Sequence, residues 1–594
     1  MKFYKLLNGF IASLLIVSVV FAGDKKMEED IDELEDRVSK VEIKAAKDKV
    51  NFDIDFRTRY DYIDYQDMSS LPQWASTMMT LWSFNRLVTP GTQAMGALND
   101  GDLIFNPQFM GAYQNILGGM FQPMAEAGFI NPDPNGTPLY QIAMNDLGVP
   151  YFTNVMTGSD IAKYQALFQG VTPEKYDKTN KALWTNRLRL GFDSEFDKHL
   201  RFAGRLSMYK AWGDATGFRW FNGQMSSMNM DGNDASIPTD DKVRIDRAYF
   251  VYQNNVLDTD YHWHFSFGRR PATSGQPNQH RENWKNAAGS PLVHIINWQF
   301  DGASLGINFG EDFILPNHAF KLCYGKGYEG GWGNSASYSS AETKDVDMMG
   351  FIWQLYNDDT FNFVTNYAYG AGITDGFAGT VITPFTINGI DINGDGGYDE
   401  YYFTANDGGY VSRFEARSVI GDMHLGTALL SYEGERFNAF VSYAFSKTIA
   451  DGRSQNPMMQ FMGTDGFLNS YGNQEDRTGN SLYAGVIGKF GNHRVGFEYN
   501  QGSKYWFNFG GAEDSPIASK LAVRGKVYEA YWHIPLHTDR FFMTLAGTLY
   551  DYDYTNSGNP MGEPVKISEL NGLDSLMPVV DKVKNFSVAF NYRY

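Results

Sequence analysis

Sixteen stretches of this chain alternate apolar and polar side chains, and the alternation is plainest in the last ten residues. There Phe586, Val588, Phe590, Tyr592 and Tyr594 alternate with polar or small residues. Successive side chains of a strand point to opposite faces, so each stretch predicts a strand with one apolar and one polar face. The predicted strands are 50–63, 184–196, 200–211, 243–253, 261–269, 297–309, 318–325, 346–356, 360–370, 423–433, 435–446, 481–490, 493–503, 523–533, 540–554 and 585–594.

The connections between these strands alternate in length. The even-numbered ones are short, such as FDKH after the second strand and GN after the twelfth, whereas the odd-numbered ones run from about twenty residues to more than a hundred. Outer-membrane barrels have short periplasmic turns and long external loops, and closure leaves no unpaired strand edge in lipid. The predicted fold is therefore all-β, a transmembrane antiparallel up-and-down β-barrel of about sixteen strands over residues 50–594.

Two segments precede the predicted barrel. Lys2 and Lys5 are followed by the apolar run FIASLLIVSVVFA, which predicts a signal peptide over 1–22 with cleavage after Ala22. Residues 24–48 then carry apolar side chains at heptad spacing, which predicts a short periplasmic coiled-coil helix. The alternative is a single amphipathic helix that lies on the periplasmic face of the same molecule. The heptad positions are Met27, Ile31, Leu34, Val38, Val41 and Ala45.

Composition narrows the classes of function. A net charge of −19 disfavours nucleic-acid binding. Cys323 is the one cysteine, so the chain has no internal disulfide, haem-attachment motif or cysteine cluster. Nucleophile-elbow, phosphate-loop and HExxH motifs are missing, and we expect neither an enzyme nor a bound cofactor. His262 and His264 lie two apart on a predicted strand, where polar lumen side chains are a better interpretation than metal ligands.

Four stretches resemble an uncharacterised family of porin-like bacterial outer-membrane proteins. They are TNRLRLGFDSEFDKHLRFAGRLSMYKAWGD (185–214), FGRRPATSGQP (267–277), FDGASLGINF (300–309) and GFEYNQGSKYW (496–506). The resemblance implies an outer-membrane β-barrel and assigns no substrate. The heptads ahead of the barrel are also similar in arrangement to phosphate-type porins, which is an analogy of architecture.

A barrel of sixteen strands is wide enough to enclose an aqueous channel, and the side chains that line it set its selectivity. Strand parity places charged side chains of both signs in the predicted lumen. The arginines are Arg57, Arg59, Arg187, Arg189, Arg201 and Arg205, and the acids are Asp53, Asp55, Asp61, Asp193 and Glu195.

The third external loop, 270–296, is locally basic. It contains Arg270, His280 and Arg281, and it follows directly on Arg269. We hypothesise that this loop folds into the barrel as a constriction that favours anions or neutral polar solutes. The equal alternative is a solvent-exposed loop whose arginines pair with neighbouring acids.

The first external connection, 64–183, is far longer than a loop requires. Leu71, Trp74, Met78 and Leu81 lie at helical spacing within it, which predicts a helical cap or plug at the pore mouth. The alternative is a small external subdomain packed on itself.

The fifth external loop, 371–422, contains DINGDGGYDEYY. Asp391, Asn393, Asp395 and Asp399 match the first positions of a calcium loop, although the twelfth position is Tyr402 rather than Glu. A turn held by Asx and Gly residues is the commoner outcome.

These features predict an integral outer-membrane porin of a Gram-negative-type bacterium, surrounded by lipid and lipopolysaccharide and assembled as a homotrimer. Its predicted activity is passive diffusion of small hydrophilic solutes or ions. The alternative is a plugged barrel that acts as an adhesin or as a scaffold for a secreted or redox partner.

Overall fold

The computed structural model describes most of residues 50–73, parts of 155–170, and 171–594 apart from 215–242, 329–344 and several shorter gaps. The predicted signal peptide, the coiled-coil segment and most of the predicted helical cap lie outside the described residues. No helix in the described part of the chain has both the length and the apolar character needed to cross a membrane.

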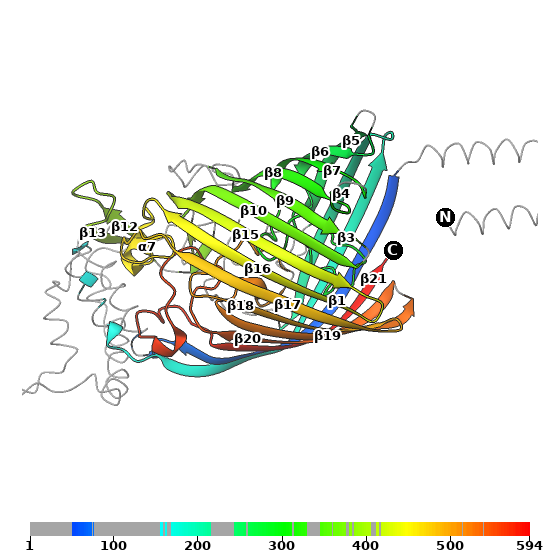
Figure 1. Cartoon of the computed structure of the whole chain (residues 1–594). Coiled ribbons are helices and arrows are strands. Elements are labelled where there is room, and N and C mark those ends of the chain that lie inside the picture. The colour runs from blue at the N-terminus through cyan, green and yellow to red at the C-terminus, as the bar shows by residue number, and fades with distance from the viewer. Residues whose placement is uncertain are drawn as a thin grey trace, which may run out of the picture.

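Sixteen antiparallel strands form one closed barrel (Figure 1). Each pairs with its neighbours along the chain, and β1 pairs with both β3 and β21 to close the circle. The strands are β1 (Val50–Ser70), β3 (Glu174–Glu195), β4 (Leu200–Gly213), β5 (Val243–Asn255), β6 (His262–Arg269), β7 (Asp301–Asn308), β8 (Ala319–Tyr328), β9 (Val346–Asn357), β10 (Phe361–Thr374), β15 (Val419–Glu433), β16 (Phe437–Ala450), β17 (Thr478–Phe490), β18 (His493–Gly502), β19 (Gly525–Thr538), β20 (Phe541–Tyr552) and β21 (Lys582–Arg593).

The predicted fold class and all sixteen predicted strands are confirmed. The largest differences are at the first connection, where β1 extends to Ser70 and β3 begins at Glu174. The connection therefore covers 71–173 instead of the predicted 64–183. The apolar pattern stops where the lipid-facing region stops, but backbone pairing needs no apolar side chains and continues beyond it.

The outer face of the barrel is apolar and exposed. On β21, Phe586, Phe590 and Tyr592 are 50%, 42% and 42% exposed, and they alternate with buried Asn585, Ser587, Ala589 and Asn591. Equally exposed large apolar side chains occur on the other strands of the barrel, among them Phe52, Leu190, Phe250, Leu305, Phe437 and Phe497. A soluble monomer does not expose apolar surface on this scale, so this face is the one that lipid covers.

Smaller elements gather at one end of the barrel. A three-stranded sheet contains β2 (Val155–Thr157), β12 (Phe385–Ile390) and β13 (Glu400–Ala405), and β11 (Gly379–Ile382) pairs with β14 (Val411–Phe414). With helix α7 (Pro457–Met462), β12 and β13 lie at the end opposite the C-terminus (Figure 1). These elements belong to the long connections β1–β3, β10–β15 and β16–β17, and their shared position agrees with the alternation of connection lengths.

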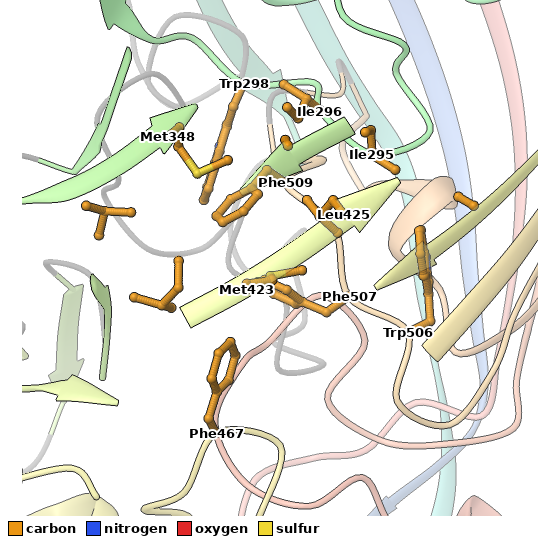
Figure 2. Close-up of a cluster of buried hydrophobic side chains, with 14 of the residues drawn as sticks. Ile295, Ile296, Trp298, Met348, Met423, Leu425, Phe467, Trp506, Phe507 and Phe509 are labelled. Atoms are coloured by element: carbon orange, nitrogen blue, oxygen red, sulfur yellow. The ribbon is translucent and has the colours of Figure 1, made fainter. Parts of the chain in front are cut away.

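The interior of the barrel contains a hydrophobic cluster. Met423 and Leu425 point inward from β15, and Met348 does so from β9. They pack against Ile295, Ile296 and Trp298 from the β6–β7 connection and against Trp506, Phe507 and Phe509 from the β18–β19 connection (Figure 2). These two connections therefore fold inside the barrel and form a core with its wall, to which Phe467, Leu468 and Met561 of two further connections contribute.

Candidate functional site

The first of these connections, residues 270–300, is called here inner loop 1. Its second half is buried against inward-facing polar side chains of the wall. His294 is hydrogen-bonded through Nδ1 to Ser442 Oγ at 2.8 Å and through Nε2 to Ser481 Oγ at 2.9 Å. Leu292 N donates to Asn366 Oδ1 at 3.1 Å. Burial lowers the pKa of His294 to about 3, so its ring is neutral at physiological pH.

The tip of inner loop 1 reaches β3, β19 and β21. Arg281 Nε donates to Glu529 Oε1 at 2.9 Å, and Arg187 Nη1 lies 3.3 Å from Glu282 Oε2. Arg593 donates to the Glu282 carbonyl and stacks over the Trp284 ring at 3.7 Å. Since His294 meets β16 and β17 while the tip meets β3, β19 and β21, the loop crosses the lumen.

Inner loop 2, residues 503–524, fills part of the remaining space. Its backbone pairs with inner loop 1 through Asn297 N to Phe509 O at 2.7 Å and Phe509 N to Ile295 O at 3.0 Å. Lys520 is buried between Glu498, 2.5 Å from its Nζ, and Glu529. Burial acts to lower the pKa of Lys520, but the two carboxylates outweigh it and raise the pKa above its ordinary value.

Inner loop 2 was missed by the sequence reasoning. Its signal is the apolar aromatic run YWFNF at 505–509, which a solvent-exposed loop has no reason to carry. Because this run directly follows the predicted strand 493–503, its apolar residues indicate a continuation of that strand when only the sequence is considered.

An arginine-rich wall is formed by β1, β3, β4 and β5. The side chains of Arg57, Arg59, Arg187, Arg189 and Arg205 all point inward, and each residue is at most 8% exposed. We name them, together with Arg247 of β5, the arginine wall. Their positions agree with strand parity, and they lie beside one another in the register, with Arg57 opposite Arg187 and Arg205 opposite Arg247.

Carboxylates neutralise only part of this wall. Arg59 pairs with Asp61 at 2.6 Å, Arg187 pairs with Asp55 at 2.9 Å, and Arg205 pairs with Asp246. Arg189 donates to Tyr209 Oη at 3.2 Å and lies 3.9 Å from Asp55. Nε and Nη2 of Arg247 are buried and have no hydrogen-bond partner among the described residues. The wall therefore carries an excess of positive charge.

Arg247 was not predicted as a lumen residue because the register shifts at this point. The β4–β5 pairing is irregular between Arg205 and Leu206, which face Arg247 and Ile245 respectively. Asp246 is the residue that the shift passes over, and it is fully buried beside Arg205. A bulge of this kind breaks the two-residue period from which faces are assigned.

The other predicted lumen charges lie at a barrel end. Arg201 and Asp193 form an ion pair, with side chains 49% and 25% exposed. Asp53 and Glu195 are exposed as well. These residues belong to the rim at the short-turn end rather than to the interior.

The structure separates the three arginines predicted to make the third external loop basic, Arg269, Arg270 and Arg281. Arg269 ends β6 and pairs with Asp301 at 2.6 Å, and Arg270 Nη2 donates to the Tyr324 carbonyl at 2.9 Å. Arg281 alone of the three reaches the β19 wall, at Glu529. They do not form one basic cluster.

The calcium-like segment forms the turn between β12 and β13. Asp391 accepts from Gly394 N at 2.7 Å and Gly396 N at 2.9 Å, and Asp399 accepts from Ile392 N at 2.8 Å. Asn393 and Asp395 accept from backbone amides two residues ahead of them. The Asx-turn alternative accounts for these bonds, and calcium binding stays a prediction. In the described part of the chain no three His, Cys, Asp or Glu side chains are grouped to hold a metal ion.

Several solved outer-membrane proteins are weakly similar to this chain. Pseudomonas putida OprB is 10% identical, with a TM-score of 0.37 over 93% of this chain and 96% of that one. Salmonella typhi OmpF in complex with daunomycin is 12% identical, with a TM-score of 0.35 over 71% and 94%. An anion-selective porin from Comamonas acidovorans is 10% identical, with a TM-score of 0.34 over 70% and 93%.

No curated protein matches this chain in sequence. One family model does match, over residues 177–594, and its description is a protein of unknown function, DUF3373. The matched region contains fifteen of the sixteen barrel strands in whole or in large part. The chain, a closed sixteen-stranded barrel, belongs to the DUF3373 family.

Proposed function

We propose that this protein is an outer-membrane porin through which small hydrophilic anions diffuse passively. The observation that carries the proposal is the arginine wall, which faces the interior of a closed barrel whose outer face is apolar. Six arginines share this wall with the buried carboxylates Asp55, Asp61 and Asp246 of the strands, and Glu282 of inner loop 1 lies against Arg187. Buried cations in such excess are costly unless anions or water approach them.

Inner loop 1 is the proposed constriction. It crosses the lumen, and the proposed path of the solutes runs between this loop and the arginine wall, whose charge then sets the selectivity. We further propose a homotrimer surrounded by lipid and lipopolysaccharide, with the predicted coiled-coil helix on the periplasmic side and no catalytic activity.

Ion selectivity in planar bilayers tests the proposal. Arg247→Gln removes a guanidinium whose Nε and Nη2 are buried without a hydrogen-bond partner among the described residues. The change should lower the permeability ratio of chloride to potassium, read from the reversal potential in a KCl gradient. Arg201→Gln is the matched control: its side chain is half exposed and paired with Asp193, and it should leave the ratio unchanged. An unchanged ratio in Arg247→Gln would contradict the anion preference.

A plugged barrel that serves as an adhesin or scaffold is the second candidate function. Its support is the hydrophobic cluster in Figure 2, because apolar packing between inner loops and wall excludes water from that part of the lumen. Conductance separates the two. A protein that is silent in bilayers, and conducts once residues 504–522 are replaced by a short Gly-Ser link, would favour the plug over the porin.

A further inference from the structure

A cavity of about 210 Å³ lies between inner loop 1 and the inner face of β5–β10. It is separate from the arginine wall, whose six arginines are not among its lining residues. Pockets for drug-sized ligands span about 300–1,000 Å³, so this one is suited to a smaller molecule.

Small side chains on the wall create the space. Ser266, Ser304 and Cys323 are register partners in one row across β6, β7 and β8, and Gly350 continues that row on β9. The next row contains His264, Gly306 and Lys321, and a Cβ at Gly306 would overlap the His264 ring. The His264 ring and the Lys321 ammonium group thus belong to strands on either side of Gly306.

Apolar side chains form another part of the cavity lining. Inner loop 1 contributes Ala272, Pro291 and Ile296, and Phe300 and Met348 complete this surface. A ligand here would therefore bury an apolar body against the loop.

The charges around the cavity all have one sign. The cations Lys321 and Arg270 line it beside the His264 ring, and no Asp or Glu does. Lys321 Nζ donates to Ser290 Oγ at 3.2 Å, and it takes part in no ion pair within the described residues. Arg270 Nε is buried without a hydrogen-bond partner there. An anionic group would supply the missing counter-charge.

We propose that this cavity binds a small organic anion, with its carboxylate at Lys321 and its apolar body against Ile296 and Phe300. The cavity thereby defines a solute class, small carboxylates with a compact apolar part, for the porin. A role of the cavity as a binding site along the path of a diffusing solute rests on the proposed function. Binding of the anion by itself does not require conduction.

Cys323 supplies a direct test, because it lines the cavity and is the only cysteine of the chain. The rate of its alkylation by iodoacetamide is measured in the folded, detergent-solubilised protein with benzoate, benzamide or acetate at equal ionic strength. Benzoate, which has both charge and ring, should slow alkylation about tenfold at ten times its dissociation constant. Benzamide and acetate, which each lack one of the two features, should protect far less at the same concentration.

Variants locate the anion at the lysine. Lys321→Met should abolish protection by benzoate, Lys321→Arg should retain it, and the exposed Lys566→Met should match the unaltered protein. Protection is taken as the rate ratio within each variant, and the heat-dependent gel shift of a folded barrel confirms folding. Equal protection by benzamide, persistent protection in folded Lys321→Met, or a Cys323 that iodoacetamide never reaches would each overturn the proposal.

The two proposals fail separately. Protection by benzoate in a protein without conductance would retain the binding site and reject the porin. Conductance without protection would retain the porin and reject the site.

Discussion

At the scale of single residues, the interior is organised by a few buried polar contacts. His294 joins inner loop 1 to Ser442 and Ser481, and the Tyr483 and Trp506 rings lie edge-on beside it. Both ring nitrogens are used in hydrogen bonds to hydroxyls. The neutral ring needs no counter-charge, which is why burial can hold its pKa so far below the ordinary value.

This pKa predicts a loss of stability in mild acid. Below about pH 6.5 the unfolded chain gains a proton at His294 while the folded protein does not, so the free energy of unfolding falls until the pH reaches the folded pKa of about 3. Between pH 7 and pH 5 the loss from this residue should be about 2 kcal/mol. Urea unfolding at both pH values measures it.

His294→Gln is the matched variant, since its amide retains hydrogen-bonding groups without titrating. The difference between pH 7 and pH 5 should shrink in this variant by about the amount assigned to His294. A difference that stays the same would show that other groups cause the acid sensitivity.

Lys520 is the second residue whose removal should be informative. Lys520→Met leaves Glu498 close to Glu529 in a buried site, and breaking a buried ion pair costs about 3–5 kcal/mol. The expected result is a lower urea midpoint. The double variant Lys520→Met with Glu498→Gln should recover part of the loss, and a double variant no more stable than the single one would refute electrostatic repulsion as the cause.

At the scale of elements, the strands and the inward path of inner loop 1 were predictable, whereas inner loop 2 and the contacts of both inner loops were not. A strand is recognised in sequence by the alternation of apolar and polar residues, and contact with lipid on one face requires this alternation in every strand. Leu188 and Arg189 could therefore be assigned to opposite faces from sequence. The inward orientation of Arg247 was not predicted, because a β-bulge in β5 shifts the two-residue alternation of faces. The side chains that inner loop 1 contacts were not predicted either. Contacts such as Arg281 with Glu529 join residues far apart in the chain, and no local sequence pattern indicates them.

The assignment of faces makes a quantitative prediction on β3. Leu188 faces outward between Phe56 and Met208, so Leu188→Arg should cost about 2–4 kcal/mol if the site lies at the bilayer midplane. Refolding from urea into lipid vesicles measures this cost. Arg189→Leu, on the inward face of the same strand, should cost less, because Asp55 keeps Arg187 at 2.9 Å, and it should alter ion selectivity. Equal tolerance of both changes would mean that the faces are assigned the wrong way round.

At the scale of the whole molecule, the barrel has two different surroundings. Lipid contacts its outer face, while inner loops 1 and 2 contact much of its inner face with the packing of a soluble protein core. The arginine wall and the cavity at Lys321 lie on different arcs of the same barrel, β1–β5 and β5–β10. Variants of Arg247 and Lys321 should therefore test the proposed ion passage and the proposed anion binding independently.

The contacts that span the lumen also have a mechanical consequence. A hollow barrel flattens under lateral pressure when neighbouring strands shear, and nothing inside it resists. Here His294 connects inner loop 1 to β16 and β17, while Arg281 and Arg593 connect it to β19 and β21. These contacts link separate parts of the barrel wall across the lumen. Flattening would stretch buried hydrogen bonds, so the roundness of the barrel is set by its own interior rather than by the tension of the surrounding bilayer.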